Sequence, residues 1–493
     1  MHEIINKISN LTLNTTEEEV YESLSELKSA IIQNGDISKS ILGNYNLLKS
    51  FENYSNESEQ NALMVCEIIE FCLSNLVLQD QNSFVTIEQI LNINCFTRIA
   101  IRKLQKDCNE ISKFVPKSTI LLIINCLKSP QVQIGPPSIE LLENFLSNEF
   151  LDDADIKREL NSCTEVNQSE IKCRIYDVAV ALASKGFSYF EKTRFILEKI
   201  INELNTNDSD ILLQMNLLEI LQGLCAQDYG LNYLEEKGVL QNLARKIQTL
   251  NENPLISLLI PSLMKFFSTV ASAFPQKIYN NYSPLIDLLF ECLMNDEDST
   301  LFYAALDTLG SITKYDDGKR SMDATFGEQI CHVLSKIYQS ITNYPSEIKV
   351  RAFQCLENVF YTDDNEPINN QIAYISRKWL QSIFATPNSF STLLNYCNMP
   401  FDDILLSAFS FLKSIVKHEF GQKKVAETGG FFEFLLNRKP GTIFEVKQKR
   451  YEVIEILAKS NEFNANQIAL FNKYVREGPN FVEPMSQIDF EPS

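Results

Sequence analysis

The chain has 493 residues, with 44 Lys and Arg against 64 Asp and Glu, so its formal net charge is −20. This charge repels nucleic-acid phosphates and anionic lipid surfaces, and no run of five basic residues offsets it. Only 15 Gly and 3 His are present, which leaves little material for phosphate loops or imidazole chemistry. Hydrophobic residues make up 45% of the chain, which argues against disorder. The composition favours a large, helix-rich binding protein and argues against nucleic-acid and membrane partners.

The cysteines and the N-terminal sequence indicate a reducing compartment. Twelve cysteines are scattered without a C-x-x-C pair, and most lie in apolar helical sequence, as Cys126 and Cys292 do. Reduced thiols that pack as small hydrophobic groups explain this better than zinc sites. The first residues lack the charged and apolar blocks of a signal peptide, and nowhere do 18 apolar residues run together. We therefore expect a cytoplasmic protein with access to the nucleus.

In chain order, most of the sequence is typical of amphipathic helices separated by short polar breaks. Leu217, Leu221 and Leu224 follow the spacing of one helix face, and alternating strand patterns are rare. Polar breaks occur at 129–130, 205–208, 251–254, 295–298 and 362–364. Several breaks place Asp, Ser or Asn before an apolar run, where the side chain caps the first turn of a helix.

Acidic clusters stand at the expected starts of helices. They lie at residues 17–19, 152–155, 296–298 and 363–364. These clusters lack the alternate ligand spacing and the central glycine of an EF-hand loop, so calcium binding is disfavoured. Helix capping and the helix macrodipole explain their placement, and an electrostatic partner site is the alternative.

An apolar triad at positions i, i+3 and i+6 recurs along the chain. The later triads are spaced by 42 to 47 residues, with one spacing of 56, as in armadillo and HEAT repeats. Asp107 interrupts the pattern, so the first third is less regular. The triads are Val65/Ile68/Phe71, Ile139/Leu142/Phe145, Tyr176/Ala179/Leu182, Leu218/Leu221/Leu224, Met264/Phe267/Val270, Leu306/Leu309/Ile312, Phe353/Leu356/Val359, Phe409/Leu412/Ile415 and Tyr451/Ile454/Leu457.

A stricter repeat includes two glycines. Gly230 and Gly238, which follow the triad at Leu218, return 191 residues later as Gly421 and Gly429, and Gly318 repeats the first of them. We expect the first glycine to end the long triad helix in a left-handed cap. A short helix follows, and the second glycine then turns the chain into the next helix. This layout is that of an armadillo-type repeat.

The fold prediction is an all-α, armadillo/HEAT-like α-solenoid, a right-handed superhelix in which each repeat buries its apolar stripe against its neighbours. We expect residues 1–493 to form one solenoid. Within it, residues 1–135 are predicted as less regular helical repeats, 136–470 as regular repeats and 471–493 as a C-terminal cap and tail.

Catalytic, cofactor and metal signatures are missing from the sequence. No phosphate loop, dinucleotide fingerprint, H-E-x-x-H, nucleophile elbow or kinase motif set occurs. His332 is interpreted as a partly buried, satisfied residue, and His418 as flanking a helix end. An enzyme would instead need a polar pocket that holds Cys331 near a histidine.

Trp379 is interpreted as a core residue, with a binding anchor as the alternative.

Five positions are candidates for partner binding. Importin-type armadillo proteins carry Trp and Asn one and five positions after the first triad residue, and only Asn358 matches that pattern here. An aromatic–amide ladder for basic signal peptides is therefore disfavoured, although acidic slots can attract basic surfaces. We call the position one residue after the first triad residue the slot, and we expect slots to face the groove of the solenoid. The alternative is that these residues are only solvated surface. The groove candidates are Asp177, Glu219, Lys265, Asp307 and Gln354.

Several short sequence segments resemble those of the 26S proteasome non-ATPase regulatory subunit 5 family. They include the segments 230–239, 261–267, 305–310 and 347–351. The C-terminal run 474–484, YVREGPNFVEP, is the most specific of them. The resemblance covers about residues 170–486, and the first 160 residues agree in helical character more than in motif.

This resemblance implies a non-enzymatic chaperone, without a cofactor, for assembly of the base of the 19S regulatory particle. Such proteins bind the C-terminal domain of AAA ATPase subunits and are absent from the finished 26S proteasome. The implied partners are 26S protease regulatory subunits 7 and 4, with non-ATPase regulatory subunit 2 as a further candidate. A general armadillo-type adaptor is the alternative function. No binding residue is transferred from the family.

Overall fold

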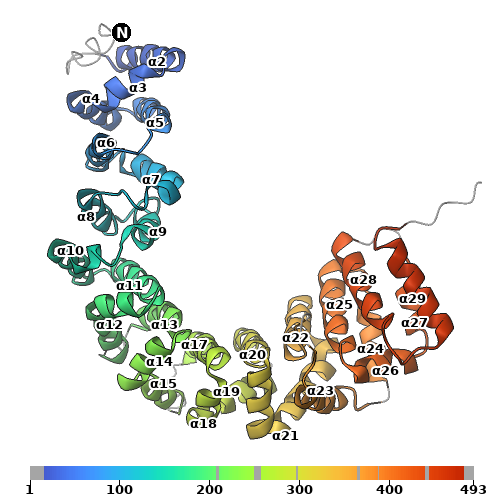
Figure 1. Cartoon of the computed structure of the whole chain (residues 1–493). Helices are drawn as coiled ribbons and strands as arrows, with labels where there is room; N and C mark the ends of the chain where they lie inside the picture. The colour runs from blue at the N-terminus through green and yellow to red at the C-terminus, as the bar shows by residue number, and fades with distance from the viewer. Residues whose placement is uncertain are drawn as a thin grey trace, which may run out of the picture. The chain divides into compact units, whose positions relative to one another are not determined.

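The computed structural model describes residues 16–206, 210–248, 257–295, 298–363, 367–386, 388–438 and 443–481. All regular secondary structure in these ranges is helical (Figure 1). Internal contacts divide the chain into two compact units, residues 1–230 (unit 1) and 231–493 (unit 2). The predicted all-α, armadillo/HEAT-like α-solenoid is confirmed. The boundaries at 135 and 470 and the handedness of the superhelix stay predictions.

Unit 1 consists of two stacked layers of helices, as the blue and green part of Figure 1 shows. Successive members of the first layer, called layer A, pack side by side: α2 (Glu17–Gln33), α5 (Glu59–Ser74), α7 (Thr97–Ile111), α9 (Gly135–Phe145), α11 (Ser169–Ser184) and α13 (Ile211–Cys225). The second layer, called layer B, holds α4 (Tyr45–Glu57), α6 (Gln81–Leu91), α8 (Lys117–Cys126), α10 (Ala154–Thr164) and α12 (Phe187–Thr206). The short elements α3 (Asp36–Leu42) and η1 (Phe150–Asp152) connect them.

Unit 2 repeats the same two layers with additional short helices. Layer A contains α17 (Ile260–Ala273), α20 (Ser299–Ile312), α22 (Ser346–Val359), α25 (Asp402–Val416) and α28 (Phe444–Leu457), followed by α29 (Ala465–Glu477). Layer B contains α15 (Val239–Gln248), α19 (Ser283–Met294), α21 (Asp316–Ser340) and α23 (Asn370–Ile383). The short helices are α18 (Pro275–Asn281), η2 (Ile341–Asn343), α24 (Ser389–Tyr396), α26 (Glu419–Glu427) and α27 (Phe431–Leu436), while α14 (Asp228–Glu236) crosses the unit boundary.

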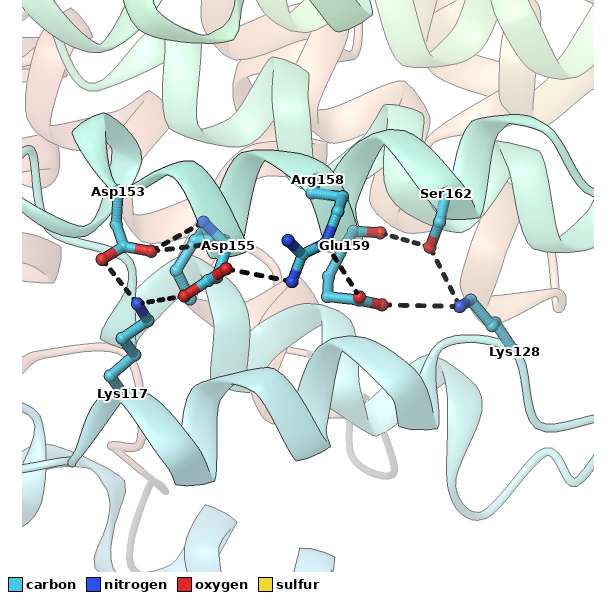
Figure 2. Close-up of polar contacts among 8 residues, drawn as sticks. Lys117, Lys128, Asp153, Asp155, Arg158, Glu159 and Ser162 are labelled. Atoms are coloured by element: carbon cyan, nitrogen blue, oxygen red, sulfur yellow. Dashed lines mark hydrogen bonds and ion pairs between the residues drawn. The ribbon is translucent and has the colours of Figure 1, made fainter.

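Acidic side chains cap helix starts where the sequence predicted them. Thr16 and Glu19 form a capping box at α2, and Asp153 and Asp298 accept first-turn amides of α10 and α20. Figure 2 shows that Asp153 and Asp155 also bind Lys117 of α8, at 2.7 Å each. The acidic clusters therefore act in capping and in repeat-to-repeat pairing. The breaks at 205–208, 251–254, 295–298 and 362–364 and the end of the run 474–484 lie wholly or partly outside the described residues.

The first repeat glycine does not end the triad helix in a left-handed cap, and that prediction is wrong. Gly230, Gly318 and Gly421 lie inside α14, α21 and α26, and none of them is among the glycines with positive φ. A Cβ atom at these positions would lie 2.3, 2.0 and 2.2 Å from the carbonyl oxygen six residues earlier. Glycine is needed because the second helix begins directly against one of the last two carbonyls of the triad helix.

The second repeat glycine turns the chain as predicted in one copy and one residue later in the other. Gly238 precedes α15 and has a φ of 70°, so the chain turns there through a left-handed residue. In the later copy the left-handed residue is Gly430, with a φ of 80°, and not Gly429. The two consecutive glycines leave the turn free to use either position, which the offset in the sequence does not decide.

Basic side chains of one repeat donate hydrogen bonds to backbone carbonyls in the neighbouring repeat. The buried guanidinium of Arg174 donates to the carbonyls of Leu127 and Ser129, 47 and 45 residues earlier, just beyond α8. Lys192 likewise donates to the carbonyl of Asn148, 44 residues earlier. These separations fall within the spacing of 42 to 47 residues between successive triads. Repeats are thus joined by charge-assisted bonds in addition to apolar packing.

The C-terminus of α22 receives three such bonds in unit 2. The carbonyl of Tyr361 accepts from buried Lys319 at 2.8 Å, and that of Thr362 accepts from Lys417 at 2.7 Å. His418 Nε2 lies 3.4 Å from the carbonyl of Phe360. Lys417 and His418 are 55 and 58 residues from their partners, across the long spacing of the repeat. Cationic groups at this site also complement the negative end of the α22 macrodipole.

Trp379 is a core residue, as predicted. Its side chain is completely buried, and its Nε1 donates to Asp323 Oδ1 of α21 at 3.1 Å. His418 flanks the start of α26, also as predicted, whereas His332 is exposed and not partly buried. His332 points away from the core because its neighbour Val333 fills the buried side of α21.

Among the described residues, no helix is long and apolar enough to span a membrane.

We expect Gly421→Ala to lower the midpoint of thermal unfolding. Its new Cβ atom collides with the backbone of Ile415, which corresponds to a loss of about 1–3 kcal/mol for overpacking. Gly429→Ala is the matched control, since no heavy atom lies within 4 Å of a Cβ there. Differential scanning fluorimetry compares the two, and equal midpoints would contradict the close approach.

Acid should destabilise the wild type more than His418→Gln. Burial lowers the pKa of His418 to about 4; the carbonyl of Phe360 opposes this shift, and the charges of Lys319 and Lys417 add to it. Between pH 6.5 and 4 the unfolded state binds a proton that the folded state does not, so stability is lost as pH falls through this window. Unfolding midpoints at pH 7.5 and 5 in phosphate-free buffer test this. An equal decrease in both proteins would show that His418 does not contribute.

Candidate partner-binding face

The five predicted groove residues all lie on layer A and are all exposed. Each follows a buried triad residue by one position, which turns its side chain out of the core. In unit 2, for example, Leu306 is 0% exposed and Asp307 57%. Two candidates are in unit 1, Asp177 on α11 and Glu219 on α13, and three are in unit 2, Lys265 on α17, Asp307 on α20 and Gln354 on α22. We call the exposed side of layer A, in each unit, the layer A face.

In unit 1 the layer A face carries a row of interacting carboxylates. Partial removal of water, and then the charge of Glu219, raise the pKa of Asp177. Burial, and then the charge of Asp177, raise the pKa of Glu143 on α9, although Lys185 opposes that shift. Three successive layer A helices thus place acids close enough to repel one another. A positively charged surface would relieve this repulsion.

In unit 2 Asp307 is already paired within the chain. Arg351 of α22 binds it at 2.5 Å, and the guanidinium lies 4.8 Å from the centre of the Tyr303 ring. The hydroxyl of Tyr303 donates to Glu347 at 3.3 Å. This cluster links α20 with α22 across the face.

Farther along the same face, lysines surround a half-buried carboxylate. Burial raises the pKa of Glu357 on α22, and four lysines oppose the shift: Lys449, Lys413, Lys314 and Lys417. Lys413 and Lys449 also bind Glu452 of α28, at 3.0 and 3.5 Å. The layer A face is therefore acidic in unit 1 and partly basic in unit 2.

Sequence reasoning missed Glu143, Arg351 and the lysines because they lie outside the slot taken from importins. The slot rule applied to the triad at Ile139 would have added Glu140, which receives a hydrogen bond from Gln105 of α7 at 2.9 Å. The same rule selects Ser410, which is buried, so the slot does not always face solvent. Glu143 and Lys413 lie four positions after a first triad residue, which places them near the slot on the same helix, whereas Arg351 and Lys449 lie two positions before one.

The structure offers little for catalysis within the described residues. No group of three His, Cys, Asp or Glu side chains there is arranged to hold a metal ion. Burial raises the pKa of Cys331, which keeps its thiol protonated at neutral pH, although Lys378 opposes the shift. The twelve cysteines are all free thiols.

Comparison with known proteins identifies the family. A family model described as "Proteasome non-ATPase 26S subunit" matches residues 1–493. The chain is 31% identical over 373 residues to the 26S proteasome non-ATPase regulatory subunit 5 of Drosophila melanogaster, covering 76% of this chain and 72% of the relative. With the Bos taurus protein of that name it shares 23% identity over 408 residues, covering 80% and 79%.

Solved structures with a similar course of the chain are helical-repeat proteins. Kap121p bound to Pho4p aligns with a TM-score of 0.47 and 12% identity, over 96% of this chain and 51% of Kap121p. A designed armadillo repeat protein in complex with the peptide (KR)4 aligns with a TM-score of 0.38 and 15% identity, over 52% of this chain and 98% of the designed protein. The full-length family match and the 31% identical relative together show that the chain belongs to the proteasome non-ATPase 26S subunit family, in the branch of regulatory subunit 5.

Proposed function

We propose that the chain is a non-enzymatic chaperone for assembly of the base of the proteasome regulatory particle. It binds the C-terminal domain of an AAA ATPase subunit on the layer A face and delays docking of that subunit until its partners arrive. The proposed ligands are 26S protease regulatory subunits 7 and 4, with non-ATPase regulatory subunit 2 as a further partner. This assembly takes place in the cytoplasm, with access to the nucleus, and needs no cofactor.

The observation that carries this proposal is the family match over residues 1–493. A non-ATPase subunit acts on its neighbours through binding, and a helical repeat protein presents a long side-chain surface for that purpose. The exposed acids of unit 1 support a protein ligand with a basic patch. The lysines around Glu357 support contact with acidic groups at a separate place. A general armadillo-type adaptor is the second candidate, favoured by the same exposed face.

The proposed chaperone should capture isolated ATPase C-terminal domains. Pull-down with each base ATPase domain in turn is expected to recover subunits 7 and 4 with the full chain. The other base ATPase domains, purified in the same way, are the controls. Absence of binding to every domain would contradict the chaperone function, and recovery of cytoskeletal or trafficking proteins from lysate in their place would favour the adaptor.

Charge reversal on the layer A face should weaken that capture. The double variant Glu219→Lys with Asp307→Lys is expected to reduce affinity about tenfold or more, because it replaces attraction to a basic surface by repulsion. Folding should be little changed, since Asp307 and its partner Arg351 are both largely exposed.

The matched control reverses two exposed layer B acids, Glu191→Lys on α12 and Glu328→Lys on α21, with the same change in net charge. Isothermal titration calorimetry against the captured domain compares the two double variants. If both bind equally well, the partner site lies elsewhere on the molecule.

A further inference from the structure

An apolar groove of about 390 Å³ lies on the layer A face of unit 1, between α2 and α5. Ile31 and Ile68 line its inner side and are almost completely buried. Ile32 and Phe71 line its outer side, where they remain 61% and 38% exposed. Large apolar side chains that gather at one exposed place are typical of surfaces that bind other proteins.

Two ion pairs border this groove. Lys28 of α2 binds Glu67 of α5 at 2.6 Å, and Arg102 of α7 binds Glu70 of α5 at 2.9 Å. All four side chains are more than one third exposed, so these pairs contribute little to the stability of the fold. An apolar centre inside a polar border is the usual anatomy of a protein–protein interface, in which the border keeps water away from the buried centre.

The groove lies in a strongly acidic part of the chain. Residues 16–75 contain eleven Asp and Glu against three Lys and no Arg, which gives a net charge of −8. Glu22 and Glu26 of α2 are among the exposed acids. A region of this charge attracts cationic surfaces and repels acidic ones. The ligand that complements this part of the chain therefore combines an apolar group with basic residues.

We propose that the groove binds one large apolar side chain, of the size of Leu or Phe, that projects from a basic surface of a protein partner. This inference rests on the proposed function, because it gives the partner of the unit 1 face an apolar anchor in addition to its basic patch. Asp177 and Glu219 lie on the layer A face of the same unit. An anchor buried in a pocket carries much of the affinity of an interface, whereas surrounding charges set orientation and association rate.

Three short capped peptides test this chemistry without an ATPase subunit: Lys-Phe-Lys, Glu-Phe-Glu and Lys-Ser-Lys. Each is titrated into the full chain labelled at the isoleucine methyl groups, and Ile32→Val assigns the NMR signal of Ile32. Lys-Phe-Lys should move that signal and bind at least about tenfold more tightly than the other two, because only this peptide offers both an apolar ring and the complementary charge. Equal or tighter binding of either other peptide, or an unmoved Ile32 signal, overturns the proposal.

A variant of the groove tests its use by a protein partner. Phe71→Ser should lower the affinity for the captured ATPase C-terminal domain about tenfold or more in isothermal titration calorimetry. Val85→Ser is the matched control, since Val85 is a similarly exposed apolar residue on α6 of layer B, and its affinity should equal that of the wild type.

The two experiments separate this inference from the proposed function. If Phe71→Ser and Val85→Ser bind the domain equally well, the groove is not the anchor site and the inference fails, while the chaperone function stands. If the wild type captures no ATPase domain, the chaperone function fails, and the peptide titration alone decides whether the groove binds an apolar group on a basic surface.

Discussion

The packing of one repeat on the next depends on basic side chains that bind backbone carbonyls in the neighbouring repeat. Arg174 binds carbonyls beyond α8 in unit 1, and Lys319 binds the carbonyl of Tyr361, just beyond α22, in unit 2. The four terminal carbonyls of a helix have no partner within it, and burial in a stack would leave them without water. A cation from the neighbouring repeat satisfies the carbonyls directly after the helix end and ties that repeat to the next. Apolar packing alone, which is not directional, does not set such a register.

This arrangement leaves the outer side of each layer A helix available. The carbonyls that join repeats lie just beyond helix ends, and most triad residues lie in the core, so the five candidate positions, each next to a buried triad residue, face solvent. In unit 1 these positions carry Asp177 and Glu219, and the charge of Glu219 contributes to the raised pKa of Asp177. In unit 2 the corresponding Asp307 is neutralised by Arg351.

Glycine at the start of the second helix of a repeat, like the cation bonds, is needed where the chain lies close to the end of another helix. Gly421 lies so close to the carbonyl of Ile415 that a side chain cannot be placed there. The same tight turn directs the start of α26, with His418 as its N-cap, toward Arg377 of α23. A geometric need of the repeat thus places Lys423 and Arg377 beside one cavity.

The sequence by itself determined the helices, the repeat spacing and the exposure of the five candidates, because these follow from apolar periodicity along single helices. Short sequence segments that resemble the family also identified it correctly. The sequence did not determine that Gly421 is helical, that Arg351 binds Asp307, or that His418 faces the carbonyl of Phe360. Each of these depends on atoms 6 to 58 residues apart in the chain. Only the tertiary structure decided them, because periodicity states which side of a helix is buried and not which distant group it meets.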